Sequence, residues 1–252
     1  MKKLFFLILI QLLFIFSLNK KTIYIIGDST AANKNITTHK VKRGWGQMFQ
    51  MFFDQSKVEI KNKAKFSQTS RSFINEGHWE KVKMKLKKGD YVLIQFGTND
   101  QKRFGKYKNR YTLVGSTFDQ YLTIYARETK LLGAIPVLMS PVVKRVWDKN
   151  GNLVNTLGKY REAAKKVASE TNSLFIDANK ITEDLEKYYG VEGSKKLHMI
   201  YKPGEEPSLP NGVTDNIHYN IFGAVLVARL FAIALGEVAP ELKPYLKTDV
   251  MR

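Results

Sequence analysis

The sequence contains no cysteine, and this absence limits how the protein is stabilised and attached. Without cysteine no disulfide bond can form, so the hydrophobic core alone must hold a folded domain together. A lipid attached through a cysteine side chain is excluded for the same reason. We also find no internal repeat and no low-complexity tract, so we expect neither a repeat array nor a disordered chain.

The N-terminus contains one apolar run, which is too short for a typical membrane span. Met1-Lys2-Lys3 precedes the apolar run 4–18, which is interrupted by Gln11 and Ser17. A bilayer-spanning helix needs about 20 apolar residues, so this pattern is more typical of a secretory signal. We predict a signal peptide over residues 1–20, export to the periplasm or the extracellular space, and no stable membrane span after processing. Because no small-x-small cleavage site lies near Ser17, an uncleaved anchor is the alternative.

Acidic residues are few compared with basic ones. The chain has 23 Asp plus Glu against 41 Lys plus Arg, a formal net charge of +18. Loss of Lys2, Lys3 and Lys20 with the signal peptide removes three charges and leaves +15. A basic surface attracts polyanions, although ordinary solvated lysines would produce the same balance. No recognition helix or aromatic RNA-binding motif accompanies the charge, so we expect no nucleic-acid partner.

The remaining 232 residues, 21–252, are enough for one well-buried domain. Short β-rich apolar runs alternate there with segments of helical period, which predicts an α/β fold with helices on both faces of a parallel sheet. A largely apolar helix is expected at Ile221–Leu235, and prolines and glycines predict a long irregular loop over Tyr201–Asn216. The predicted strands, about five in number, are Thr22–Ile26, Val58–Ile60, Tyr91–Phe96, Ile135–Met139 and Leu174–Ile176.

Three short polar blocks follow or face the ends of these strands, where sheets of this kind bind ligands. Gly27-Asp28-Ser29-Thr30 can present a serine hydroxyl after the first strand, and Gly97-Thr98-Asn99-Asp100 can present an amide after the third. In Asp215-Asn216-Ile217-His218 the carboxylate can accept from Nδ1–H of the histidine, leaving Nε2 as a base. Taken singly, the first two blocks are also ordinary turns, and Asp215 could be a helix N-cap.

In combination, the three blocks resemble the SGNH, or GDSL-type, hydrolases, which carry Gly-Asp-Ser, Gly-x-Asn-Asp and Asp-x-x-His in this order. Further segments resemble the rhamnogalacturonan acetylesterase branch of that family, from about Ile23 to about Leu235. These segments are Arg43–Gln47, Ser70–Gly77, Asp90–Gly97, Gly193–Leu197 and Asp215–Asn220 with Gly223-Ala224. The resemblance implies a three-layer α/β/α fold of the flavodoxin-like type. It also implies an esterase that removes acetyl groups from pectic polysaccharide with no metal and no cofactor.

The resemblance further implies a role for each site residue. Ser29 would be the nucleophile, His218 the base and Asp215 the group that stabilises the imidazolium. The backbone N–H groups of Ser29 and Ser67 and the side chain of Asn99 would form the oxyanion hole.

Two positions depart from the family pattern. Ser67 stands where the family usually has glycine, so we expect its backbone to adopt a conformation that glycine prefers. The alternative is a loop that has turned away from the oxyanion hole, so that the backbone N–H of Ser67 does not contribute to it. Thr98 stands where histidine is common. The implied partner is an acetylated acidic polysaccharide or oligosaccharide, which fits the basic charge. An SGNH esterase or lipase with a different acyl substrate, or a catalytically silent carbohydrate-binding relative, are the alternatives.

Overall fold

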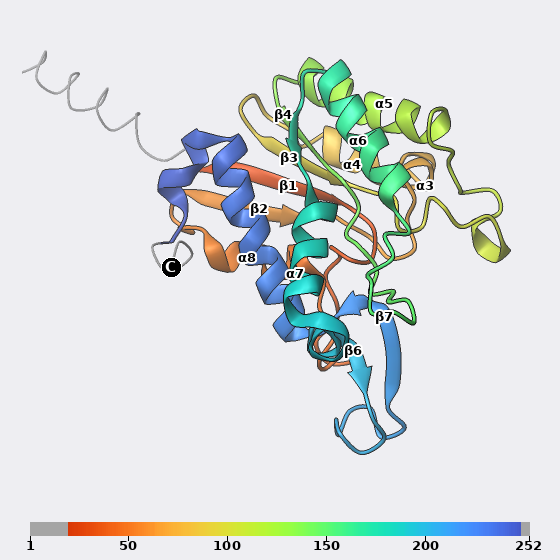
Figure 1. The fold of residues 1–252 in the computed structure, drawn as a ribbon. Helices are drawn as coiled ribbons and strands as arrows, with labels where there is room; N and C mark the ends of the chain where they lie inside the picture. The colour runs from red at the N-terminus through yellow and green to blue at the C-terminus, as the bar shows by residue number, and fades with distance from the viewer. Residues whose placement is uncertain (1–19, 248–252) are drawn as a thin grey trace, which may run out of the picture.

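The computed structural model describes residues 20–247, in which a central sheet lies between two groups of helices (Figure 1). All strands of this sheet pair in parallel, in the order β2-β1-β3-β4-β5. This is the flavodoxin-like order, so the predicted fold class is confirmed. The strands are β1 (Lys21–Gly27), β2 (Val58–Asn62), β3 (Tyr91–Gln95), β4 (Ile135–Met139) and β5 (Leu174–Ile176). The predicted bounds of β4 and β5 match these, and the other predicted ends differ by one or two residues.

Alternating side chains on the strands divide the core into two layers, one on each face of the sheet. The first layer lies under α3 (Ser70–Asn75), α4 (His78–Lys83), α5 (Thr117–Leu131) and α6 (Gly158–Glu170). The second lies under α2 (Trp45–Met48), the 3₁₀ helix η1 (Phe49–Phe52), α7 (Ala178–Gly193), α8 (Ile221–Val238) and the 3₁₀ helix η4 (Pro240–Tyr245). Because helices cover both faces, the central strand β3 is buried along its whole length.

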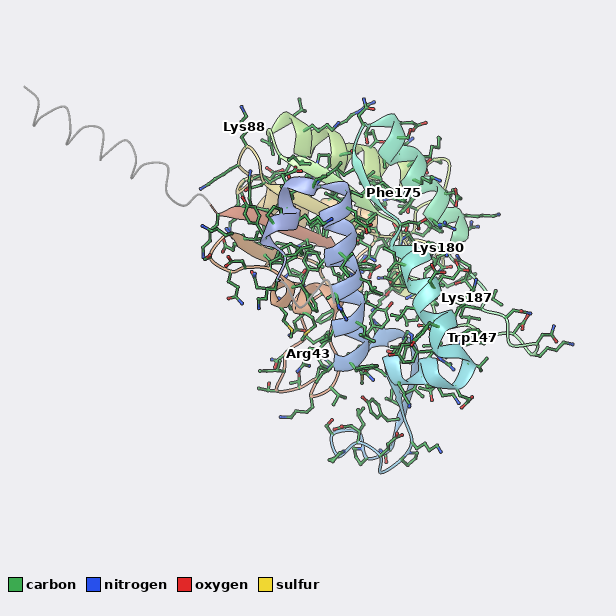
Figure 2. All side chains as sticks on the ribbon, turned by 60° about the vertical axis from the view of Figure 1, so that its left-hand side comes forward. Arg43, Lys88, Trp147, Phe175, Lys180 and Lys187 are labelled. Carbon is green, nitrogen blue, oxygen red and sulfur yellow. The ribbon has the colours of Figure 1, made fainter. Side chains whose placement is uncertain are left out.

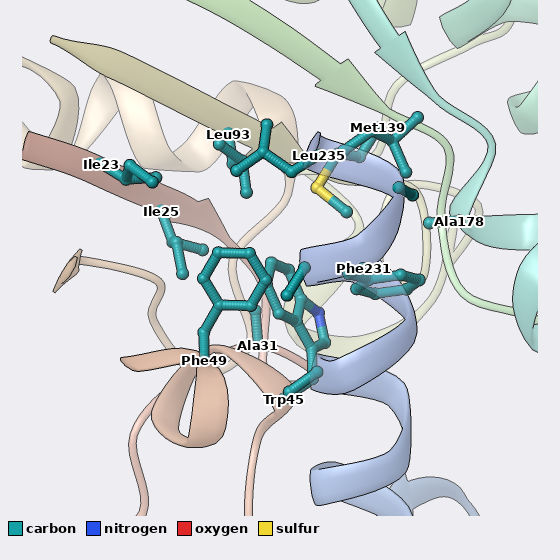
Figure 3. Packing of buried hydrophobic residues seen from close by; sticks show 14 of the residues in the cluster. Ile23, Ile25, Ala31, Trp45, Phe49, Leu93, Met139, Ala178, Phe231 and Leu235 are labelled. Carbon is teal, nitrogen blue, oxygen red and sulfur yellow. The ribbon is translucent and has the colours of Figure 1, made fainter. Parts of the chain in front are cut away.

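The second layer is built around Trp45. Its ring packs edge-on against Phe231 of α8 with 5.0 Å between ring centroids, beside Ile25 and Phe49 (Figure 3). Its indole N–H donates to Oε1 of Gln95 at 2.9 Å, so the polar end of the ring is also satisfied. This packing attaches α2 and α8 to the carboxyl end of β3.

Helix α8 has 18 residues and a mean hydropathy of 2.1, which by length and composition is enough to cross a membrane. Half of the helix is buried within the described chain, and Val227, Phe231 and Leu235 contact the sheet layer. A core helix that is covered on most sides is expected to be this apolar. The predicted signal peptide, by contrast, lies outside the described residues apart from Lys20.

The order of the strands creates a switch point beside β1. From β1 the chain moves to β2 on one side and then returns to β3 on the other, so the connections diverge. Gly27 and Gln95 are paired in register at the carboxyl ends of β1 and β3. The polar blocks that begin directly after them therefore start side by side, at the place where doubly wound sheets bind ligands.

The predicted loop over Tyr201–Asn216 is wrong at both ends. Strands β6 (His198–Tyr201) and β7 (Val213–Tyr219) form an antiparallel pair beyond the main sheet, which limits the loop to residues 202–212. The prolines all lie within this shorter segment, so they mark the tip of a hairpin and not the whole stretch. The hairpin projects below the body in Figure 1.

A consequence is that Asp215 and His218 lie on a strand. The N-cap of α8 is Asn220, whose side chain accepts a hydrogen bond from the backbone N–H of Gly223 at 2.9 Å. The alternative interpretation of Asp215 as the N-cap is therefore wrong, because four strand residues and the cap Asn220 separate it from the helix.

Candidate active site

Ser29 lies in a tight turn at the end of β1. The Asp28 carboxylate accepts hydrogen bonds from the backbone N–H and the hydroxyl of Thr30, each at 2.8 Å. These two bonds stabilise the turn. A side chain at Gly27 would place its Cβ 2.5 Å from the carbonyl oxygen of Gln95. Glycine is required there because β3 approaches closely, and the serine hydroxyl is thereby presented at the sheet edge.

The three residues predicted to act together form a continuous hydrogen-bonded chain. Ser29 Oγ lies 2.8 Å from His218 Nε2, and His218 Nδ1 lies 2.7 Å from Asp215 Oδ2. The backbone N–H groups of Ile217 and His218 donate to the other carboxylate oxygen at 3.0 and 3.1 Å. The carboxylate is thus held by its own strand while it orients the ring, the arrangement that a serine nucleophile and its base require.

The charge of Asp215 is stabilised by its surroundings. Burial raises the pKa of this carboxyl, but the hydrogen bonds from the His218 ring and backbone and the nearby Lys42 outweigh it and hold the pKa well below its ordinary range. Lys42 Nζ lies 3.2 Å from Asp215 Oδ2. Sequence reasoning missed Lys42, because 173 positions separate it from Asp215 and no local motif connects the two.

Ser67 has the left-handed backbone conformation expected of a residue in a glycine position. Its φ is 58°, and within residues 20–247 Asn172 is the one other non-glycine residue with a positive φ. A left-handed conformation costs an L-residue roughly 1 kcal/mol. The hydroxyl of Ser67 accepts a hydrogen bond from Lys106 Nζ at 2.9 Å, so the side chain lies toward a basic segment at the rim of the site.

The amide of Asn99 is buried and its orientation is specified by two hydrogen bonds. Nδ2 donates to the carbonyl oxygen of Gln68 at 2.9 Å, and Oδ1 accepts from Lys102 Nζ at 2.8 Å. Nδ2 carries a second N–H, which has no hydrogen-bond partner among the described residues. Asn99 and Ser29 line the same cavity, which the predicted role of Asn99 in the oxyanion hole requires.

Asp100 connects the two loops that carry Asn99 and Ser67. The fully buried carboxylate accepts from the backbone N–H and hydroxyl of Ser70, at 2.9 and 2.6 Å, and from the hydroxyl of Thr112 at 2.7 Å. Its second oxygen accepts from the backbone N–H of Gly97 at 3.0 Å. Burial raises the pKa of Asp100 to about 6 in spite of these donors. The last residue of the Gly-x-Asn-Asp block therefore supports the site without lining it.

A cavity of about 350 Å³ lies over these groups. Ser29, Ser67, Asn99 and His218 line it, together with the rings of Phe66 and Tyr107. A larger cavity of about 950 Å³ lies between the β6–β7 hairpin and the end of α7, away from Ser29 and His218. Within residues 20–247, no three His, Asp or Glu side chains gather in a way that could hold a metal ion.

The chain is similar to known proteins along most of its length. Residues 23–231 match the sequence model of a family described as GDSL-like Lipase/Acylhydrolase. The chain is 38% identical to the rhamnogalacturonan acetylesterase RhgT of Bacillus subtilis, over 89% of this chain and 93% of that protein. It is 26% identical to a rhamnogalacturonan acetylesterase of Emericella nidulans, over 85% of this chain and 84% of that protein.

Solved structures agree on the fold. Protein YXIM of Bacillus subtilis superposes with a TM-score of 0.72 at 27% identity, over 87% of this chain and 57% of that longer chain. The acetylxylan esterase Axe2 of Geobacillus stearothermophilus superposes with a TM-score of 0.61 at 20% identity, over 86% of this chain and 94% of that one. The second likeness concerns the fold alone.

Proposed function

The chain belongs to the GDSL-like lipase/acylhydrolase family, and on that premise we propose that it is a carbohydrate esterase that removes acetyl groups from rhamnogalacturonan-type pectic polysaccharide. The observation that carries the proposal is the chain of hydrogen bonds from Ser29 through His218 to Asp215. Similarity to two proteins named rhamnogalacturonan acetylesterase, along most of their lengths, supports the choice of substrate.

In the proposed mechanism, Ser29 Oγ attacks the acetyl carbonyl carbon while His218 Nε2 accepts the hydroxyl proton. The ionised Asp215 stabilises the imidazolium that forms, and it keeps Nε2 directed at the serine. The tetrahedral oxyanion accepts hydrogen bonds from the backbone N–H groups of Ser29 and Ser67 and from Nδ2 of Asn99. His218 then donates its proton to the leaving sugar oxygen, which releases the deacetylated polysaccharide.

The acetyl-enzyme is hydrolysed by the same groups in reverse roles. His218 accepts a proton from a water molecule that attacks the acetyl carbon, and the oxyanion again forms at the same donors. Ser29 recovers its proton from His218 as acetate leaves.

The walls of the cavity favour a short acyl group over a long one. Phe66 and Tyr107 supply the aromatic surface, and the other lining side chains are polar or charged. A long acyl chain would leave most of its apolar surface against polar groups or water, which is unfavourable. We therefore favour acetyl esters over the lipase alternative, and the intact hydrogen-bonded triad favours an enzyme over a silent binding protein.

Export is part of the proposal. Pectic polysaccharide is a polymer that an enzyme meets outside the cytoplasm, and residues 1–20 have the pattern of a secretory signal. Fractionation of cells that produce the full chain, compared with a form lacking residues 1–20, tests this. Retention of both forms in the cytoplasm would contradict export.

The experiment that tests the activity is acetate release by purified protein from acetylated rhamnogalacturonan, acetylated xylan and a series of 4-nitrophenyl esters. We expect release from the pectic polymer, faster turnover of the acetate ester than of the octanoate, and loss of roughly 10⁴-fold or more in Ser29→Ala. A Ser29→Ala variant with wild-type activity would disprove the mechanism. Preference for the octanoate would favour a lipase.

A further inference from the structure

Four lysines line the cavity over Ser29, and in the described part of the chain no Asp or Glu lines it with them: Lys34, Lys42, Lys102 and Lys106. The charge of Lys42 is compensated, because it forms an ion pair with Asp215. The other three differ from it in this respect. Each forms its hydrogen bond with a neutral group, and none has an ion-pair partner among residues 20–247.

Lys34 is 4% exposed and comes from the segment that follows the nucleophile. Nζ donates to the backbone carbonyl oxygen of Ser29 at 2.6 Å and lies 4.0 Å from the centroid of the Phe66 ring. The backbone N–H and carbonyl of Lys34 are both hydrogen-bonded to the side chain of Gln47, which fixes its position. Burial of this amino group disfavours its charged form unless a negative charge lies nearby.

Lys102 and Lys106 come from the segment that joins β3 to α5, which contains the 3₁₀ helix η2 (Gly105–Tyr107) and projects from the body of the molecule in Figure 1. Their ammonium groups lie 4.7 and 5.4 Å from the centroid of the Tyr107 ring. Through their hydrogen bonds to Asn99 and Ser67 they also lie beside the two loops of the oxyanion hole.

Some lysines elsewhere on the surface have carboxylate partners. On α7, Lys180 pairs with Asp184 and Lys187 pairs with Glu183, each one helical turn apart (Figure 2). What distinguishes the cavity is that its lysines converge on one site, which no Asp or Glu of the described chain lines with them.

The charges at the cavity also oppose one another. Burial, together with the nearby Lys42, lowers the pKa of Lys34 to about 7, although Asp28 and Asp215 act in the opposite direction. An anion placed among these groups would relieve the repulsion and replace part of the lost solvation. The acyl group of an acetyl ester carries no charge, so such an anion must belong to the alcohol side of the substrate.

We propose that Lys34, Lys102 and Lys106 form a subsite for a carboxylate of the substrate, on a sugar residue close to the acetylated one. The identity of the ester in this inference rests on the proposed function. The binding of the anion does not depend on it. It assigns the substrate class as esters of carboxylate-bearing saccharides, with the negative charge held within one or two sugar units of Ser29.

The test is calorimetric binding of an unacetylated tetragalacturonate to the full protein, which needs no turnover. We expect Lys106→Gln to weaken binding about fivefold or more and Lys106→Arg to retain most of the affinity, since a hydrogen bond to a charged group is lost in the first and kept in the second. Lys108→Gln is the matched control, because this exposed residue of the same segment does not line the cavity. It should change affinity less than twofold.

Three results would overturn the subsite. They are equal weakening in Lys106→Gln and Lys108→Gln, equal affinity for tetragalacturonate and its methyl ester, and no binding of tetragalacturonate at millimolar concentration. Hydrolysis of 4-nitrophenyl acetate, measured in parallel, keeps the two proposals separate. Protein that hydrolyses this ester without binding tetragalacturonate refutes the subsite alone, whereas protein that binds without hydrolysing supports the subsite and refutes the esterase.

Discussion

Ser67 combines a glycine-like backbone with a side chain that contacts Lys106. The backbone N–H can donate to an oxyanion from any residue that tolerates the left-handed conformation, so serine is compatible with the hole. The hydroxyl adds a contact that glycine lacks, and through it the oxyanion loop is tied to the basic segment after β3. Backbone strain and an added side-chain contact thus occur at one residue.

Replacement of Ser67 by glycine separates these two effects. Ser67→Gly should preserve or raise kcat for acetyl-ester hydrolysis, because glycine adopts a φ of 58° without strain. In the serine protein this backbone conformation costs roughly 1 kcal/mol. Turnover of 4-nitrophenyl acetate and urea unfolding measure the two quantities. Asn99→Ala serves as the comparison, with an expected loss of about 10²–10³ in kcat because an oxyanion donor is removed. A tenfold or larger fall in Ser67→Gly would mean that the hydroxyl itself takes part.

Among the secondary-structure elements, the loops after β2 and β3 behave as one unit. Asp100 from the loop after β3 accepts two hydrogen bonds from Ser70 at the start of α3, and Thr112 adds a third from the far end of the projecting segment. These bonds fix where Ser67 and Asn99 stand relative to each other. The two loops that carry the proposed oxyanion donors are therefore joined by a buried carboxylate that does not line the cavity.

The stability of this unit should depend on pH. Burial raises the pKa of Asp100 from 3.8 to about 6, so between these values the folded state binds more protons than the unfolded state. The contribution of Asp100 to stability is therefore fully present below about pH 4 and is lost as pH rises through about 6, by up to about 3 kcal/mol. In urea unfolding at pH 4.5, 6.0 and 7.5, the free energy of unfolding of wild type should fall relative to that of Asp100→Asn as pH rises. Parallel pH curves for the two proteins would contradict this.

A third element, β7, supplies both Asp215 and His218. Arg145, from the segment after β4, holds the neighbouring residue of this strand. Its guanidinium donates to Oδ1 of Asn216 at 3.0 Å, and its backbone N–H donates to the Asn216 carbonyl oxygen at 3.0 Å. Arg145 thus connects β7, which lies outside the main sheet, to the segment that follows β4 of that sheet.

Across the whole molecule, the net charge of +18 combines with the uncompensated lysines at the cavity. Long-range attraction between the protein and a polyanion is screened by salt, with a Debye length of about 10 Å at 0.1 M and 3 Å at 1 M. A neutral ester experiences little of this field. Polymeric and small substrates should therefore respond differently to ionic strength.

The prediction is that KM for acetylated rhamnogalacturonan rises about tenfold or more between 0.05 and 0.5 M NaCl. Over the same range kcat/KM for 4-nitrophenyl acetate should change less than twofold, because that ester carries no charge. Acetylated xylan, which is largely neutral, is the polymeric control. Equal salt sensitivity of all three substrates would indicate a general salt effect on the enzyme and would refute electrostatic capture.

The sequence by itself determined where the strands of the sheet lie, and it predicted the three residues that the structure joins in one hydrogen-bonded chain, Ser29, His218 and Asp215. Strand positions follow from local apolar periodicity, and the chemistry of Ser29 and His218 follows from short motifs, both of which are legible within a few neighbouring residues. Even the unusual backbone of Ser67 could be expected from its place in a motif that usually has glycine.

Only the tertiary structure decided what surrounds these residues. Asp215 lies on a strand because β6 pairs with β7, a contact that the intervening prolines concealed. Lys34 and Lys42 come from the loop after β1, and Lys102 and Lys106 come from the loop after β3; no motif connects the two loops. Their convergence over Ser29 depends on the strand order, which places the ends of β1 and β3 side by side, and no local pattern encodes a distance between residues so far apart in the chain.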